Sequence, residues 1–102
     1  MTKNIMLVCS AGMSTSLLVT KMEKAALDKS IAVEIFATAA AEADSVQKEK
    51  SPDIIMLGPQ VRYMLDEFKK KYSVPVVVID MRSYGMMDGG KVLTQALNII
   101  ED

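Results

Sequence analysis

A thiol followed by small and hydroxyl-bearing residues is the feature of this sequence best suited to chemistry. Cys9 is the single cysteine of the chain. Backbone N–H groups of a loop that leads into a helix can form a nest for an anion, and the helix N-terminus adds a positive dipole. The same field favours the thiolate form of a nearby cysteine. A loop of this kind can carry a phosphoryl group on sulfur, held by its outer oxygens. The residues that would build it are Ser10, Gly12, Ser14, Thr15 and Ser16.

An alternative interpretation of the same residues is structural. Cysteine is among the most frequently buried residue types, so Cys9 on a core strand could serve packing alone. Hydroxyl residues at a helix start are commonly caps, which would account for Ser14 or Thr15. A binding module that uses the nest for a phosphorylated ligand, with an inert Cys9, is a further alternative.

The elements around this loop alternate between apolar runs and helical patterns. We expect strands at residues 5–9, 31–36, 53–57 and 75–79, and helices at 14–29, 39–50, 60–72 and from Gly89 or Gly90 to 100. This alternation predicts an α/β fold with a parallel sheet and helices on both faces. The expected strand order is 2-1-3-4, a flavodoxin-like or phosphatase-like three-layer sandwich, with the first and last helices on one face. Cys9 then falls at the switch point between strands 1 and 3, where such sheets bind ligands.

Composition narrows the possible functions. The chain has 102 residues, 12 basic against 13 acidic, and no histidine. We expect one domain over residues 1–102, no internal disulfide, no metal or other cofactor, and no nucleic-acid partner. The apolar run at 5–9 is too short for a signal peptide, and no run approaches the roughly 20 residues of a membrane span. We therefore expect a cytoplasmic protein.

Residues 9–16, Cys-Ser-Ala-Gly-Met-Ser-Thr-Ser, resemble the phosphocysteine loop of the IIB subunits of the bacterial sugar phosphotransferase system, of the lactose/cellobiose/chitobiose type. The resemblance extends to Leu-Gly-Pro-Gln at 57–60, Val-Ile-Asp at 78–80, Tyr84-Gly85 and Asp88-Gly89. It implies a phosphotransferase in which Cys9 accepts phosphate from a histidine of the IIA protein. The phosphate then passes to a sugar, of the β-glucoside-type disaccharides, that arrives through the membrane protein IIC. The implied phosphate cradle is Ser10, Ala11, Gly12, Met13, Ser14, Thr15 and Ser16.

The loop also resembles the signature of low-molecular-weight tyrosine phosphatases, but with one informative departure. Thr15 occupies the position where those enzymes have an arginine. Without a guanidinium there is no fixed bidentate clamp for the charge of the transition state. A carrier benefits from this loss, because its phosphocysteine must last until an acceptor arrives. A phosphatase-like thiol enzyme is the second hypothesis.

Three further residues have both a structural and a functional interpretation. Gln60 follows Pro59 at a helix entry, or lies beside the cradle and touches a docking partner. Asp80 caps the turn after strand 4, or acts on the site electrostatically. Tyr84 belongs to a turn with a half-exposed ring, or forms a lid or partner contact near Cys9. Several methionines near these loops either fill gaps or form an adaptable apolar rim: Met13, Met81, Met86 and Met87.

Overall fold

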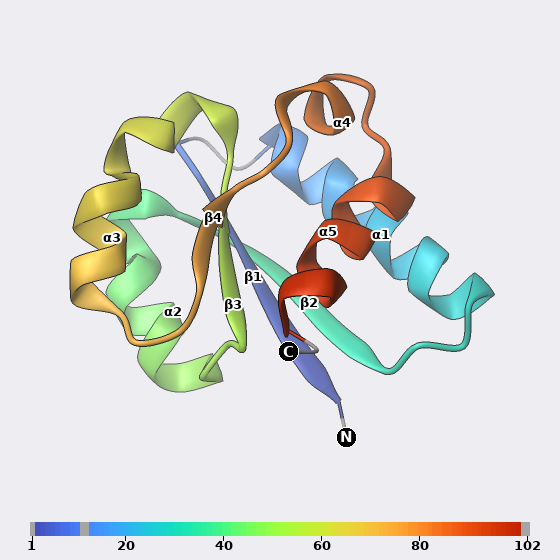
Figure 1. Cartoon of the computed structure of the whole chain (residues 1–102), viewed down its shortest axis with the longest axis horizontal. Helices are drawn as coiled ribbons and strands as arrows, with labels where there is room; N and C mark the ends of the chain where they lie inside the picture. The colour runs from blue at the N-terminus through green and yellow to red at the C-terminus, as the bar shows by residue number, and fades with distance from the viewer. Residues whose placement is uncertain (1, 11–12, 101–102) are drawn as a thin grey trace.

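The computed structural model describes residues 2–10 and 13–100, and it contains one parallel sheet between two layers of helices (Figure 1). The strands are β1 (Lys3–Cys9), β2 (Val33–Ala39), β3 (Ile54–Leu57) and β4 (Val76–Val78). The helices are α1 (Met13–Asp28), α2 (Ala43–Lys50), α3 (Leu65–Lys71), α4 (Met81–Gly85) and α5 (Gly89–Ile100). Two 3₁₀ segments, η1 (Ala40–Glu42) and η2 (Pro59–Met64), precede α2 and α3.

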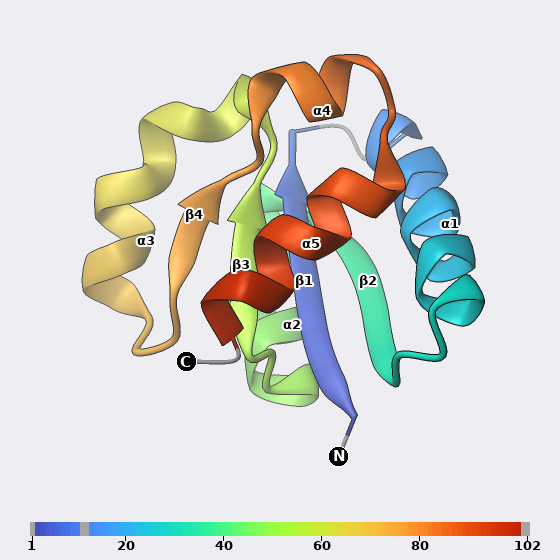
Figure 2. The same ribbon diagram turned by 45° about the vertical axis from the view of Figure 1, so that its right-hand side comes forward.

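The strand order is β2-β1-β3-β4, with every neighbouring pair parallel, so the predicted fold class is confirmed. β1 lies in the interior of the sheet, and its residues from Ile5 to Val8 are fully buried. A strand covered on both faces is expected to be a continuous apolar run, which is what this segment is. All four strands point toward the edge where α4 lies (Figure 2).

Each face of the sheet has its own apolar core. On one face, α1 and α5 pack over Ile5, Leu7 and Met56. On the other face, α2, η2 and α3 pack over Met6, Val8 and Ile55. The alternation of β1 side chains between the two faces therefore divides one apolar run between two cores. This confirms the predicted pairing of the first and last helices.

The second strand was predicted at residues 31–36, but in the structure its carboxyl end lies three residues later, at Ala39. β2 pairs with β1 from Lys3↔Val33 through Cys9↔Ala39, so it continues over Ala37, Thr38 and Ala39. Alanine has a weak preference for strands. The ladder with β1 overrides this preference and brings the small Ala39 level with Cys9.

The helix predicted at 60–72 is divided in the structure. Pro59 occupies the first turn of the 3₁₀ segment η2, where its fixed φ is compatible, and Val61 has non-helical angles of φ −116° and ψ 22°. The regular helix α3 begins only at Leu65. The two parts nevertheless share one apolar face, because Val61 and Phe68 are buried and Met64 and Leu65 pack against the same core.

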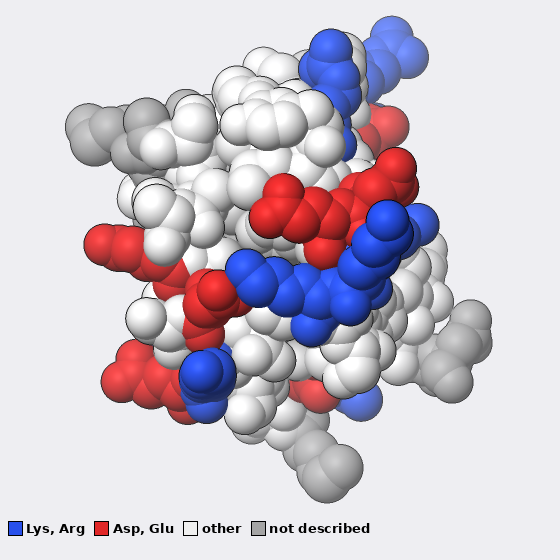
Figure 3. Space-filling model, turned by 90° about the vertical axis from the view of Figure 1, so that its left-hand side faces the viewer, with Lys and Arg blue, Asp and Glu red and all other residues white. Residues whose placement is uncertain are grey.

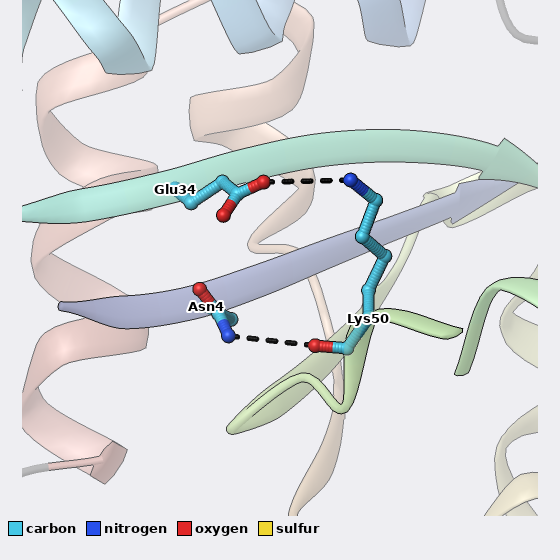
Figure 4. A network of polar contacts seen from close by, with 3 residues as sticks. All are labelled: Asn4, Glu34 and Lys50. Atoms are coloured by element: carbon cyan, nitrogen blue, oxygen red, sulfur yellow. Dashed lines mark hydrogen bonds and ion pairs between the residues drawn. The ribbon is translucent and has the colours of Figure 1, made fainter. Parts of the chain in front are cut away.

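Polar contacts tie the amino-terminal ends of the strands to the end of α2. Asn4 N donates to Asp53 Oδ2 at 2.8 Å, and Asn4 Nδ2 donates to the carbonyl oxygen of Lys50 at 3.4 Å. Lys50 Nζ lies 3.6 Å from Glu34 Oε2 on β2 (Figure 4). These contacts lie at the opposite end of β1 from Cys9, so they brace the sheet without touching the candidate site.

The surface over α2 and α3 carries charges of both signs side by side (Figure 3). Asp44 of α2 forms an ion pair of 2.8 Å with Lys71 of α3 and accepts a hydrogen bond from the hydroxyl of Tyr72. The hydrogen bond from Lys71 holds the pKa of Asp44 below its usual range. This group joins the two helices of the second core at the surface.

The two helices of the first core meet at a glycine. A Cβ atom on Gly89 would lie 2.5 Å from the carbonyl carbon of Lys21 and 2.6 Å from the backbone nitrogen of Met22. Gly89 is buried, so the start of α5 lies directly on the backbone of α1. Only a residue without a side chain allows this approach.

We expect Gly89→Ala to lower the free energy of unfolding by about 2–3 kcal/mol, toward the upper end of the cost of overpacking, because backbone must move to admit the methyl group. Urea denaturation followed by circular dichroism measures the change. Gly85→Ala is the matched control, since nothing lies within 4 Å of the methyl group it adds. Equal stability of the two variants would contradict the close approach of α5 to α1.

Candidate functional site

Cys9 is the last residue of β1 and lies at the carboxyl edge of the sheet, at the predicted switch point. Cys9 is only 4% exposed. Hydrogen bonding continues beyond the neighbouring strand, because Gly58 N donates to the carbonyl oxygen of Val8 at 2.7 Å. The loop after β3 is therefore fixed directly beside the end of β1.

The structure describes part of the predicted phosphate cradle. Ser10 is exposed, α1 begins at Met13, and Ser16 is exposed on that helix. The predicted contacts of Ala11 and Gly12, and of the side chains of Met13 and Ser14, lie outside the described residues. α1 begins four positions after Cys9, one residue before the predicted start of the helix.

Thr15, at the position of the phosphatase arginine, is buried in the first turn of α1. Its residue is 1% exposed, and its Oγ1 has no hydrogen-bond partner among the residues that the structure describes. Buried hydroxyl groups are nearly always hydrogen-bonded. The Thr15 hydroxyl could therefore donate a hydrogen bond to an oxygen of a bound anion.

Gly58 separates Cys9 from the side chain of Gln60. The position that a Cβ atom on Gly58 would take lies 3.8 Å from Cys9 Cβ and 3.1 Å from Gln60 Oε1. Gln60 Nε2 donates a hydrogen bond to the Tyr84 hydroxyl at 3.3 Å. The structure thus brings Gln60 and Tyr84, two of the three further candidates, together beside Cys9.

Tyr84 lies in the short helix α4, where a turn with a half-exposed ring was predicted. That prediction is wrong, because the residue is 9% exposed and packs in the core formed with α1 and α5. Asp80 begins the helix, and its Oδ2 accepts hydrogen bonds from Ser83 N at 3.0 Å and Ser83 Oγ at 2.9 Å. The capping interpretation of Asp80 is confirmed. The bond from the Ser83 backbone N–H, followed by that from its hydroxyl, holds the pKa of Asp80 below its usual range.

Gln95 of α5, which the sequence analysis did not single out, fixes the start of this segment. Its Oε1 accepts a hydrogen bond from Asp80 N, and its Nε2 donates to the carbonyl oxygen of Val78, each at 3.0 Å. Gln95 lies 15 residues after Asp80 in the chain, and no local pattern links the two. Together these bonds hold α4 against the end of β4.

Exposed apolar side chains occur in the segments that follow the carboxyl ends of the strands. Met81 and Met86, at the two ends of α4, are 59% and 63% exposed, as the hypothesis of an apolar rim requires. Met87 instead packs partly against the core. Leu17 in α1 and Tyr63 in η2 extend the set, and sequence reasoning missed both because each lies in a segment with a clear apolar face elsewhere. We call Leu17, Tyr63, Met81 and Met86 the apolar rim.

The described residues form neither a metal site nor a membrane span. Across residues 2–10 and 13–100, no three His, Cys, Asp or Glu side chains lie close enough together to hold a metal ion. Within the same part of the chain, no helix combines the length and apolar composition needed to cross a membrane.

Comparison with known proteins gives consistent results for sequence and for fold. Residues 4–95 match the family model described as the lactose/cellobiose-specific IIB subunit of the phosphotransferase system. The cellobiose-specific EIIB component of Lactococcus lactis subsp. lactis is 49% identical, and the galactose-specific EIIB component of L. lactis subsp. cremoris is 48% identical. Each match spans 96% of both chains.

A solved structure has the same architecture. The solution structure of a cellobiose-specific phosphotransferase IIB component from Borrelia burgdorferi superposes with a TM-score of 0.81 at 39% sequence identity. The superposition covers 99% of this chain and 94% of the other. The arrangement of the strands and helices is therefore that of a known fold.

We expect Asp80→Ala to destabilise the protein at neutral pH, because α4 loses its N-cap. The pKa of Asp80 is lower in the folded state than its ordinary value of 3.8. The contribution of this carboxylate is therefore complete above about pH 4 and is lost as the pH falls through the lowered pKa. The difference in unfolding free energy between wild type and Asp80→Ala should shrink over that range, as measured by urea denaturation at a series of pH values.

Asp80→Asn is the control for this titration. Its amide oxygen can still accept from Ser83 N but does not titrate, so its stability relative to Asp80→Ala should stay constant with pH. A constant difference between wild type and Asp80→Ala down to pH 2 would contradict the assignment.

Proposed function

This chain belongs to the lactose/cellobiose-specific IIB subunits of the phosphotransferase system, and we propose that it carries a phosphoryl group on Cys9 between a IIA protein and a sugar. In the first step the sulfur of Cys9 attacks phosphorus in line, the S–P bond forms, and the N–P bond to a histidine of IIA breaks. The imidazole nitrogen keeps the electron pair of that bond and can take up the proton that leaves the thiol.

In the second step a sugar hydroxyl oxygen, presented by the membrane protein IIC, attacks the same phosphorus. The O–P bond forms, the S–P bond breaks, and the sulfur leaves with its electron pair and can take up the proton of the hydroxyl. Cys9 is thereby regenerated as the acceptor for the next cycle, and no cofactor is required.

The position of Cys9 in the fold is the main observation that supports this proposal. The residue ends a buried strand, α1 begins four positions later, and Gly58 leaves space on the side toward β3. The buried Thr15 hydroxyl, which has no hydrogen-bond partner among the described residues, lies in the first turn of α1. We propose that the backbone amides of residues 10–16 and the hydroxyls of Ser10, Ser14, Thr15 and Ser16 hold the phosphoryl oxygens.

The absence of arginine from residues 9–16 supports a carrier over a phosphatase. A guanidinium clamp would stabilise the transition state for attack by water as well as by an acceptor. Backbone amides and hydroxyls hold the phosphoryl group with less charge compensation. The phosphocysteine then survives long enough to be passed on.

The apolar rim supports docking of protein partners at the same edge. Its four side chains come from the segments that follow β1, β3 and β4, and these segments leave the sheet at the edge where Cys9 lies. Methionine and tyrosine give adaptable contact area, which suits a surface that binds IIA and IIC in turn. A cytoplasmic location, with membrane association only through IIC, follows from this exchange.

The sugar is proposed at the level of its class. The two relatives reported above are named for cellobiose and for galactose, at nearly equal identity to this chain. We propose an acceptor of the β-glucoside-type disaccharides, such as cellobiose, chitobiose or lactose, with the choice among them made by IIC.

We expect Cys9→Ser to abolish phosphocysteine formation. Wild type incubated with phosphorylated IIA should gain one phosphoryl group on Cys9, as shown by intact mass and peptide mapping, and Cys9→Ser should gain none at that position. Cys9→Ala, which adds no buried hydroxyl, is the second variant, and its thermal melting verifies the fold. An adduct that maps away from Cys9 would contradict the carrier assignment.

The same preparations separate the alternative functions. Turnover of p-nitrophenyl phosphate by wild type without a partner would favour the phosphatase-like enzyme. Unchanged affinity of Cys9→Ala for a phosphorylated ligand, with no adduct on wild type, would favour the plain binding module.

We expect Tyr63→Ser to raise the IIA concentration needed for half-maximal transfer to Cys9 by about tenfold, because an aromatic side chain that becomes buried in an interface contributes on the order of 1–2 kcal/mol. Leu27→Ser is the matched control. Leu27 is equally exposed, at 79%, but lies at the far end of α1 from the apolar rim. Equal effects of the two substitutions would contradict docking at the rim.

A further inference from the structure

β4 lies at an edge of the sheet, next to β3. Just past its end, Ile79 N donates to the carbonyl oxygen of Leu57 at 2.8 Å, so the N–H of Ile79 points toward β3. Neighbouring residues of an extended chain direct their backbone groups to opposite sides. The carbonyl oxygen of Val78 and the N–H of Asp80 therefore point away from β3, where the described part of the chain adds no further strand.

The carboxamide of Gln95 pairs with both of these backbone groups. Its Nε2 donates to the carbonyl oxygen of Val78 and its Oε1 accepts from Asp80 N, each at 3.0 Å. A carboxamide offers the same donor and acceptor as a peptide group, so this side chain takes the place of a residue of another strand. Because Gln95 lies in α5, which packs in the core through Leu93 and Ala96, it ties the end of an edge strand to a fixed helix.

These two bonds come immediately before α4 in the chain. Asp80 is the N-cap of α4, and its side chain accepts from Ser83 N. Tyr84 N donates to the carbonyl oxygen of Asp80 at 2.9 Å. The residue that begins the helix is thus the residue whose N–H is bound by Gln95. Gln95 accordingly fixes the point at which α4 leaves the sheet.

α4 carries the part of the apolar rim that follows β4. Met81 and Met86, at its two ends, are exposed, whereas Ser83 and Tyr84 are buried. A helix of five residues is too short to be stable by itself, so the position of α4 depends on its contacts with the rest of the protein. Loosening its start would displace both methionines from their places in the rim.

We propose that Gln95 is a positioning residue for the docking of IIA, because it holds the start of α4 and with it Met81 and Met86. This inference rests on the proposed function. When only a fraction of the molecules has the binding-competent arrangement, the apparent affinity falls by that fraction, and the molecules with partner bound react as before. Loss of the Gln95 bonds should therefore raise the IIA concentration that transfer requires and leave the maximal rate unchanged.

The test measures transfer from phosphorylated IIA to Cys9 over a range of IIA concentrations. Gln95→Glu keeps the length of the side chain but replaces the donor to Val78 with a carboxylate oxygen, and Gln95→Met removes donor and acceptor together. We expect each to raise the IIA concentration for half-maximal transfer about fivefold, as when roughly one molecule in five keeps α4 in place, with a maximal rate within about twofold of wild type. A lower maximal rate at an unchanged IIA requirement would overturn the positioning role.

A double-mutant cycle tests whether Gln95 acts through the rim. In a variant with Met81→Ser and Met86→Ser, which lacks the α4 part of the rim, Gln95→Glu should cause no further rise in the IIA requirement. Effects that multiply would overturn the route through α4. Asn98→Asp is the matched control, since Asn98 is exposed on the same helix and the same change from amide to carboxylate there should leave the IIA requirement at the wild-type value.

Amide hydrogen exchange distinguishes local loosening of α4 from loss of the fold. In Gln95→Met the N–H of Tyr84 should exchange faster than in wild type, while the N–H of Ile79, bonded to β3, should keep its protection. Equal loss of protection at both positions, or no loss at Tyr84, would contradict a role confined to α4.

The proposed function and this inference fail on different results. If wild type gains no phosphoryl group on Cys9, the proposed function fails. If wild type is phosphorylated and Gln95→Glu requires no more IIA than wild type, only this inference fails.

Discussion

The structure depends on the burial of β1 within the parallel sheet. Its backbone is hydrogen-bonded to β2 on one side and β3 on the other, and its side chains enter both cores. Parallel strands place their carboxyl ends at one edge, so Cys9, Gly58 and the start of α4 converge there. This convergence places the candidate site at the carboxyl edge of the sheet, because the loop after β1 leaves the sheet where the loops after β3 and β4 also leave it.

Two glycines allow the close approaches on which this arrangement relies. Gly89 lets α5 lie on the backbone of α1 and so completes the core that receives Tyr84. Gly58 leaves the space between Cys9 and the amide of Gln60. Gln95 joins α5 to the segment between β4 and α4, since it bonds to the backbone at Val78 and Asp80. The position of the Tyr84 hydroxyl is therefore set by contacts from three separate segments of the chain.

The site has no arginine between residues 9 and 16, which distinguishes it from a phosphatase loop of similar form. The backbone amides and hydroxyls of the proposed site are neutral donors, and they would stabilise a transferring phosphoryl group less than a guanidinium would. A carrier requires this moderate stabilisation, since the phosphoryl group must be accepted and then released. The apolar rim around the same edge suits the exchange of partners that such a cycle demands.

The sequence by itself determined the alternation of elements, the strand order, the division of the helices between the two faces, and the place of Cys9. These depend on local apolar patterns and on the handedness of crossovers, which act on any chain with this order of elements. Even so, the carboxyl end of β2 and the 3₁₀ start before α3 departed from prediction, because pairing with β1 and burial of Val61 outweighed local propensity. The roles of residues 10–16 remain predictions from sequence. Only the tertiary structure decided that Tyr84 is buried, that Gln60 bonds to it, and that Gln95 fixes α4, because each contact joins residues at least 15 positions apart through a common core.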